Sequence, residues 1–450
     1  MHYARDMQSL YFSLLAKLLD TESKCQTLVR GFAIDSRLVE EDSLFFALPG
    51  ESVDGHDFLK EVAAKGALGA VVQRSYDGED FGLELIRVDD VREALQKLAR
   101  KVLEKRKSQV VAITGSMGKT TTKGFITTLL EGSCHFYASP KSYNSQVTLP
   151  LSILNAEGDA EVLILEMGMS EPGQIEKLVS IAPPDIAVLT TVALQHMDLF
   201  PEGLLAICEE KSAIFSHPRT KVGIVSRDIP HFAHAETAGN CPKTTFSKNP
   251  RGADYSYQLG KDKITVTEGK TAIDIPLALP MAHHYHNFVA AVIVARKLGL
   301  PWEVICQRAP LVQLPPMRFE KVEREGIVFI NDAYNANPEA MRAALHSLPE
   351  PKKGGKRIGV IGGMNALGRF SEEGHKMVGQ ESLHALDVLL CLGEQCLVMK
   401  EIWDRAKRPA FHFATREELE QHLKGCAAPG DVVLLKGARA HALDEILNQY

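Results

Sequence analysis

The 450-residue sequence lacks the patterns that mark membrane and secreted proteins. Its apolar runs fall well short of the roughly 18 residues that a membrane span requires. Its first residues contain no basic stretch followed by an apolar core and a small-residue cleavage site, so no signal peptide is predicted. We therefore expect a cytoplasmic protein without a membrane span.

Paired cysteines and an excess of positive charge are also missing. The eight cysteines form no C-x-x-C pair, so we expect reduced thiols and no zinc site. A net charge of −6 and a pI near 6.3 give no basic footprint for nucleic acid. The hydrophobic content of 45% and charged content of 24% are ordinary for a globular protein. The length suggests roughly two to four domains.

The most informative stretch is VVAITGSMGKTTT, from Val110 to Thr122. Its apolar start predicts a buried strand, and a helical pattern follows its last residues. A strand, a tight loop and a helix N-terminus form an anion site, because backbone N–H groups and the helix dipole point at a phosphate. Gly115 and Gly118 allow close backbone approach. Lys119 would reach the β- and γ-phosphates, and Thr120 would offer its hydroxyl to magnesium.

The stretch is not a complete Walker A motif, because Ile113 stands where that motif has its first glycine. A shorter Gly-x-x-Gly-Lys-Thr string is also compatible with a plain strand-to-helix turn. The order of strand, loop, lysine, threonine and helix favours nucleotide binding. The candidate phosphate-binding residues are Gly115, Ser116, Met117, Gly118, Lys119, Thr120 and Thr121.

Strands that alternate with helices along the chain predict an α/β fold of three domains. The first covers residues 1–107 and the second, with the phosphate loop on a parallel sheet, residues 108–313. Residues 255–279 predict a hairpin added to this sheet. The prolines of residues 314–316 mark the next boundary, and residues 314–450 form a smaller Rossmann-like α/β domain. That domain lacks the Gly-x-Gly-x-x-Gly spacing, so no dinucleotide site is expected.

Two polar residues follow buried-type strands of the central domain. Glu166 ends one strand and His196 follows the next. In open parallel sheets, ligands gather at the carboxyl ends of strands, and a carboxylate there can hold magnesium. Together they make a metal site plausible, although a lone histidine is more often a hydrogen-bonded loop residue.

Other candidates have a structural interpretation that the sequence leaves open. Lys211 lies in a helical run beside two glutamates, where spacing alone predicts a surface lysine. Asn144 and Asn287 could read a substrate or a base, or could be caps, and Asn287 opens a helix predicted over 287–298. The segment 331–338, NDAYNANP, is either a dense hydrogen-bonding loop or a turn with an N-cap.

These motifs together resemble the Mur ligases, ATP-dependent enzymes that form amide bonds in cell-wall synthesis. The resemblance spans all three domains. The loop over 332–338 is most similar to that of family members that join D-alanyl-D-alanine to UDP-N-acetylmuramoyl tripeptide through an acyl phosphate. The motifs that carry the resemblance are residues 114–122, residues 332–338, Asp35 to Arg37, Asp54 to His56, and Asp431 to Gly437.

The resemblance implies a role for each matching residue, with ATP and Mg²⁺ as cofactors. Lys119 and the loop amides would bind the phosphates, Asn287 the adenine, and Arg318 and Asp332 would close on the nucleotide. Thr120 and Glu166 would hold one magnesium ion. His196 would hold a second, bridged by Lys211 if that lysine carries a carbamate. Lys119, Lys211 and His196 are thus the residues expected to serve catalysis.

The resemblance also implies which domain holds which substrate. The first domain would bind the UDP moiety, the second ATP and the third the dipeptide, in a protein expected to be a monomer. The sequence departs from the family pattern at several positions, including Asn331 and Ala366, which leaves the finer substrate contacts open. The candidate substrate-binding residues are Asp35, Ser36 and Arg37 for uridine, Asn144 for the tripeptide, and Tyr334, Asn335, Asn337 and Pro338 for the dipeptide.

Four other functions compete with this interpretation. A related ligase could add a different amino acid, or the protein could be similar to folylpolyglutamate synthase. The 334–338 loop and the Asp35–Arg37 motif argue against the latter. A P-loop nucleotide switch would bind ATP without depending on an acceptor. A scaffold with a decayed ligase site is disfavoured, because the expected phosphate and metal residues are present.

Overall fold

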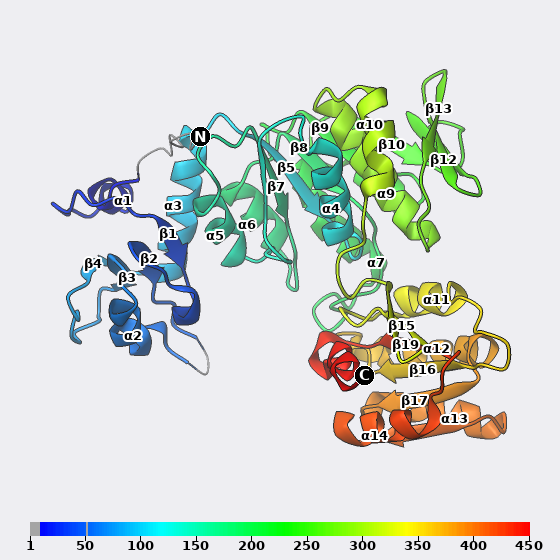
Figure 1. The fold of residues 1–450 in the computed structure, drawn as a ribbon. Coiled ribbons are helices and arrows are strands. Elements are labelled where there is room, and N and C mark those ends of the chain that lie inside the picture. The colour runs from blue at the N-terminus through cyan, green and yellow to red at the C-terminus, as the bar shows by residue number, and fades with distance from the viewer. Residues whose placement is uncertain (1–9, 51–52) are drawn as a thin grey trace.

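The computed structural model describes residues 10–50 and 53–450, which form three α/β domains in chain order (Figure 1). The N-terminal domain contains one four-stranded parallel sheet in the order β1-β2-β3-β4. Its elements are α1 (Phe12–Leu18), β1 (Gly31–Ala33), β2 (Ser43–Phe46), α2 (Leu59–Ala64), β3 (Gly69–Gln73), β4 (Glu84–Val88) and α3 (Val91–Lys105).

The N-terminal domain packs on the central domain through α3. Asp90 caps this helix by accepting a hydrogen bond from the Glu93 amide at 2.8 Å. The apolar face of α3 lies against α5 (Thr148–Leu154) and α6 (Gln174–Ile181), and one hydrophobic core runs through both domains.

The central domain has a nine-stranded sheet in the order β13-β12-β11-β10-β9-β8-β5-β7-β6. The strands from β11 to β6 are parallel, and β12 and β13 form the predicted antiparallel hairpin. The strands are β5 (Gln109–Thr114), β6 (Phe136–Ala138), β7 (Val162–Glu166), β8 (Ile186–Leu189), β9 (Val222–Ser226), β10 (Lys243–Ser247), β11 (Tyr255–Leu259), β12 (Lys263–Glu268) and β13 (Thr271–Pro276).

Strand β5 explains why the first motif begins with an apolar run. Val110 and Ala112 face the core shared with α5 and α6, whereas Val111 and Ile113 face the core under α4 and α9. Both faces of the strand are buried, as expected for the centre of a parallel sheet. The remaining helices are α4 (Lys119–Leu130), α7 (Leu204–Ser212), α8 (Phe232–Thr237), α9 (Ala282–Lys297) and α10 (Trp302–Arg308).

The start of α9 corrects one prediction. The helix begins at Ala282, five residues before the predicted start, because His283 to His286 continue the helical turn. Asn287 therefore lies inside the helix and is buried, with 3% of its surface exposed. The interpretation of Asn287 as a helix cap is wrong.

The C-terminal domain has a six-stranded sheet in the order β14-β15-β19-β16-β17-β18, parallel except between β14 and β15. It lies beyond the carboxyl ends of the central strands (Figure 1). No helix among the described residues is long and apolar enough to cross a membrane. The elements are β14 (Glu320–Arg324), β15 (Ile327–Asn331), α11 (Pro338–His346), β16 (Arg357–Gly362), α12 (Ser371–Ala385), β17 (Val388–Leu392), α13 (Leu397–Arg405), β18 (Ala410–Phe413), α14 (Arg416–Cys426) and β19 (Val432–Lys436).

Candidate active site

The loop between β5 and α4 is closed by two glycines with positive φ, Gly115 at +148° and Gly118 at +85°. A Cβ at Gly115 would lie 1.9 Å from Thr190 Oγ1, and one at Gly118 would lie 2.3 Å from Asn287 Oδ1. Neither position has room for a side chain. The Lys119 ammonium folds back over the loop and donates to the Gly115 carbonyl at 2.7 Å. This backbone arrangement is suited to cradling phosphate.

The Thr120 hydroxyl lies close to two other side-chain oxygens. It donates to Glu166 Oε2 at 3.2 Å and lies 3.1 Å from the Ser142 hydroxyl. Glu166 is completely buried, and its other oxygen pairs with the ammonium of Lys123 at 2.8 Å. Hard oxygen donors of this kind fit Mg²⁺, so the residues present match the implied metal.

Three cationic or imidazole groups face the same space. Burial lowers the pKa of Lys119 to about 8, with the nearby charge of Arg318 acting in the same direction. Burial and the neighbouring Lys119 hold the pKa of Lys211 well below its ordinary value. Burial also lowers the pKa of His196. Lys119 and the Arg318 guanidinium line the same cavity and can offer positive charge to a polyanion such as a triphosphate.

The structure overturns the surface interpretation of Lys211. Only 1% of this lysine is exposed, in the last turn of α7. Its neighbour Glu210 points elsewhere, because its carboxylate accepts from the amides of Gly173 and Ile175 at 2.8 Å and so caps the start of α6. The expected surface ion-pair series does not form.

The C-terminal domain closes the site from the other side. The Arg318 guanidinium donates to Thr120 Oγ1 at 3.1 Å and lies over the Tyr334 ring at 4.3 Å. Asp332 accepts from the Phe319 amide at 3.0 Å and pairs with Lys436 at 2.6 Å. Both residues line the same cavity as the phosphate loop.

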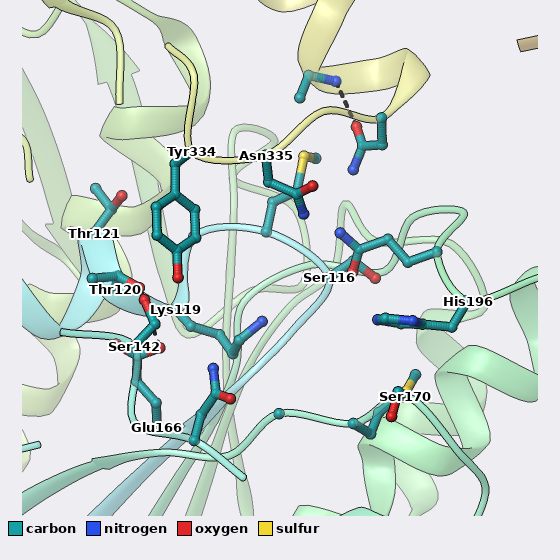
Figure 2. A pocket seen from close by; sticks show the side chains of 18 of the residues that line it. Ser116, Lys119, Thr120, Thr121, Ser142, Glu166, Ser170, His196, Tyr334 and Asn335 are labelled. Carbon is teal, nitrogen blue, oxygen red and sulfur yellow. Dashed lines mark hydrogen bonds between the residues drawn. The ribbon is translucent and has the colours of Figure 1, made fainter. Parts of the chain in front are cut away.

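The 331–338 segment combines both of its interpretations. Asn337 is the N-cap of α11, since its side chain accepts from the Ala340 amide at 2.8 Å. Asn335 accepts from the Ala336 amide at 2.8 Å. Tyr334 and Asn335 nevertheless face the loop of the central domain (Figure 2). The segment is thus an N-capped turn that also presents side chains to the site.

A cavity of about 650 Å³ joins these features, and all three domains line it. In Figure 2 the Lys119 side chain points into the space between Glu166 and His196. The predicted residues that line the cavity are Ser116, Met117, Gly118, Lys119, Thr120, Thr121, Asn144, Glu166, His196, Lys211, Asn287, Arg318, Asp332, Tyr334, Asn335 and Asn337.

The other predicted residues lie outside the lining. The Gly115 carbonyl accepts from the Lys119 ammonium, and Pro338 is the first residue of α11. Asp35, Ser36 and Arg37 form a short helical turn in the N-terminal domain. There the Asp35 carboxylate caps the Arg37 amide at 3.0 Å and pairs with its guanidinium at 2.7 Å. These three residues are not brought together with the phosphate loop.

Sequence reasoning missed several residues of the site. Lys436 lies in the Asp431–Gly437 motif and Ser142 lies two residues before Asn144, so their types were a usable signal. His284 is buried beside His283 with an unpartnered Nδ1, and nothing in the pattern of a helix start indicates this. The missed lining residues include Arg92, Ser142, Ser170, His283, His284 and Lys436.

The fold and site define a three-domain P-loop protein whose candidate nucleotide site lies between its central and C-terminal domains. Three family descriptions match the sequence in order. They are Mur ligase family, catalytic domain, over residues 28–102; Mur ligase middle domain over 113–295; and Mur ligase, glutamate ligase domain, over 317–439. The chain belongs to the Mur ligase family.

Named relatives and solved structures match nearly the whole chain. A Bacillus subtilis (strain 168) protein named UDP-N-acetylmuramoyl-tripeptide--D-alanyl-D-alanine ligase is 32% identical over 435 residues, covering 94% of this chain and 93% of that protein. The crystal structure of MurF ligase from Thermotoga maritima in complex with ADP is 29% identical, with a TM-score of 0.79 and coverages of 93% and 96%. MurF from Acinetobacter baumannii shares the fold, with a TM-score of 0.85, 24% identity and coverages of 98% and 99%.

Proposed function

We propose that the chain joins D-alanyl-D-alanine to UDP-N-acetylmuramoyl-tripeptide at the expense of ATP, as the names of its relatives describe for them. The observation that carries the proposal is the single cavity in which the phosphate loop, Glu166 and the Tyr334–Asn337 segment meet. A nucleotide, an acyl donor and an acceptor would each contact a different domain there. We place the reaction in the cytoplasm and the active form in a monomer.

The first chemical step would transfer the γ-phosphoryl group of ATP to the terminal carboxylate of the tripeptide. Lys119 and the loop amides would hold the triphosphate and offset the charge that develops on the transferring group. Arg318 would add a second cation from the opposite side. The products of this step are an acyl phosphate and ADP.

The second step would form the amide bond. The neutral amine of the dipeptide attacks the acyl carbon, and the tetrahedral intermediate collapses to release phosphate. The Tyr334–Asn337 segment would orient the dipeptide next to that carbon. Docking of the C-terminal domain on the cavity would also exclude water, which otherwise hydrolyses the acyl phosphate.

Thr120 and Glu166 would hold magnesium, which would offset the negative charge of the phosphate oxygens. His196 and Lys211 would belong to a second metal position. Because burial lowers the pKa of Lys211 well below its ordinary value, its amine is available in the neutral form that reacts with CO₂ to give a carbamate. That modification would turn a buried amine into an oxygen donor beside His196.

Phosphate release from ATP tests the proposal, with UDP-N-acetylmuramoyl-tripeptide and D-alanyl-D-alanine added singly and together. We expect release only with both substrates and a pentapeptide product by mass. Release without either substrate would instead indicate the nucleotide switch considered above. Release with the tripeptide and another amino acid or dipeptide would indicate a ligase of different acceptor specificity.

A further inference from the structure

Lys123 is a buried cation that the proposed chemistry leaves without a role. It lies one turn beyond Lys119 in α4, and 8% of its side chain is exposed. Its ammonium lies 2.8 Å from Glu166 Oε1, 2.6 Å from the Ser139 carbonyl and 2.5 Å from the Lys141 carbonyl. The two carbonyls accept hydrogen bonds from the ammonium, and the contact to Glu166 is an ion pair.

The first of these contacts fixes the orientation of Glu166. Because Lys123 holds Oε1, the second oxygen of the carboxylate faces the Thr120 hydroxyl at 3.2 Å. That is the pair of oxygens assigned to the cation. Glu166 has no exposed surface, and this ion pair and the Thr120 hydroxyl together hold its two oxygens in place.

The other two contacts hold the loop that follows β6. Lys141 has a φ of +48°, a conformation that is unfavourable for a side-chain-bearing residue. The contact between its carbonyl and Lys123 offsets this strain. The same loop brings the Ser142 hydroxyl to 3.1 Å from Thr120, and the Asn144 carbonyl accepts from the Gly168 amide at 2.8 Å. Ser142 and Asn144 both line the cavity.

We propose that Lys123 is a positioning residue that links the Thr120–Glu166 oxygen pair to the loop 139–145. One ammonium orients Glu166 for the cation and fixes the loop that lines the acyl-substrate side of the cavity. The inference rests on the magnesium assignment of the proposed function. It predicts that Lys123 sets how strongly Mg²⁺ enhances nucleotide binding, although this lysine does not line the cavity.

Calorimetric titration with ADP, in Mg²⁺ and in EDTA, tests the first half. The quantity of interest is the Mg²⁺ factor, which is the dissociation constant of ADP in EDTA divided by that in Mg²⁺. Outer-sphere partners of metal ligands change metal affinity by roughly 10–100-fold, so Lys123→Met should lower the factor about tenfold while ADP affinity in EDTA changes little. The matched control is Lys297→Met, which removes an exposed lysine at the end of α9 and should leave the factor unchanged.

A double-variant comparison protects the test against misfolding. Lys123→Met leaves a buried carboxylate unpaired, whereas Lys123→Met with Glu166→Gln is neutral at both positions and should fold more readily. If Lys123 acts through Glu166, adding Lys123→Met to Glu166→Gln should change the Mg²⁺ factor less than twofold. Independent, additive losses would overturn the inference, as would an unchanged factor in Lys123→Met.

Hydrogen exchange of residues 139–145 tests the second half. The amides should exchange faster in Lys123→Met than in Glu166→Gln, because only Lys123→Met removes the contacts to the Ser139 and Lys141 carbonyls. Equal protection in both variants would overturn the proposed link to the loop. Failure of the ligase proposal would look different, because phosphate release would then be independent of acceptor while the Mg²⁺ factor stayed sensitive to Lys123.

Discussion

At the scale of single residues, the site combines buried groups whose charge states are set by their surroundings. Burial lowers the pKa of both Lys119 and Lys211, and the charge of Lys119 lowers the pKa of Lys211 further. Such groups are costly in an empty site and become favourable when a polyanion binds. Their placement by backbone glycines and by α7 indicates a site built before its ligand arrives.

Replacing Lys119 should remove activity without removing the fold. Lys119→Met keeps most of the side-chain volume and loses the ammonium that would face the β- and γ-phosphates. We expect the rate of phosphate release to fall at least roughly 100-fold, in the range for a lost electrostatic contact to a transition state. Initial-rate kinetics and a thermal melt measure the two effects, and a melting temperature lowered by more than about 8 °C would point to a structural role instead.

His286 should make the central domain sensitive to acid. Its Nε2 lies 3.1 Å from the Thr190 carbonyl, and burial lowers its pKa to about 4. The unfolded chain takes up this proton near pH 6.5 and the native protein near pH 4. Stability is therefore present above pH 6.5 and lost as the pH falls between these values.

The expected loss from His286 is about 2 kcal/mol of unfolding free energy between pH 7 and pH 5. His286→Gln keeps a donor for Thr190 and has no group that titrates in this range. Urea titrations at the two pH values should show a smaller decrease for the variant than for the parent chain. Equal decreases would mean that other groups, such as His283, cause the acid sensitivity.

At the scale of elements, the site is made by loops that follow the carboxyl ends of strands. The β5–α4 loop, the end of β7 and the segment after β8 lie side by side because β5 pairs with both β7 and β8. The 331–338 segment follows β15 in the same way in the C-terminal sheet. Such positions tolerate irregular backbone because the sheet fixes their ends.

Asn337 offers a way to separate helix capping from substrate binding. Asn337→Ala should cost about 1 kcal/mol of stability, the usual value for a lost cap, whereas Asn337→Asp should preserve it. Thr415→Ala is the matched control, because Thr415 caps α14 through the Glu418 amide and does not line the cavity. If Asn337 also contacts the dipeptide, Asn337→Ala should raise the KM for D-alanyl-D-alanine more than Thr415→Ala does.

At the scale of the whole molecule, the C-terminal domain rests on the segment that carries His196. The Met197 amide donates to the Ala366 carbonyl at 3.0 Å, and Arg369 donates to the Pro201 carbonyl at 2.8 Å. Arg318 adds the contact to Thr120 described above. Docking of the C-terminal domain and the geometry of the His196 segment are thus physically linked.

Weakening the contact between Arg369 and Pro201 should slow turnover without weakening nucleotide binding. Arg369→Met removes the hydrogen bond to Pro201 and lies outside the cavity lining. We expect kcat to fall roughly 2–10-fold, about 0.4–1.4 kcal/mol, with an unchanged Kd for ADP. Arg405→Met, an exposed arginine on α13 that pairs with Glu401, is the control. An equal effect of both substitutions would exclude a specific role of the contact.

The sequence determined the local part of the site. Short-range patterns predicted the Gly115–Thr121 loop, the buried strand before it and the position of Glu166 at a strand end. Phosphate binding needs closely spaced glycines, a lysine and a helix start, and all of these are local in the sequence. The hairpin within residues 255–279 was also predicted from a short-range pattern. The family motifs also predicted that Arg318 and Asp332 would approach the nucleotide, and the structure places both on the cavity.

Only the tertiary structure decided which side chains are buried and what they contact. Lys211 reads as a surface residue, because nothing local indicates that Glu210 caps α6 and that the lysine turns inward. Asn287 lies within α9 because the histidines before it pack in the helix start, against their weak helical propensity. Lys123 acquired three partners from segments 16 to 43 residues away, a set that no spacing rule encodes. Burial and charge pairing depend on distant segments, so the chain had to be folded before they were visible.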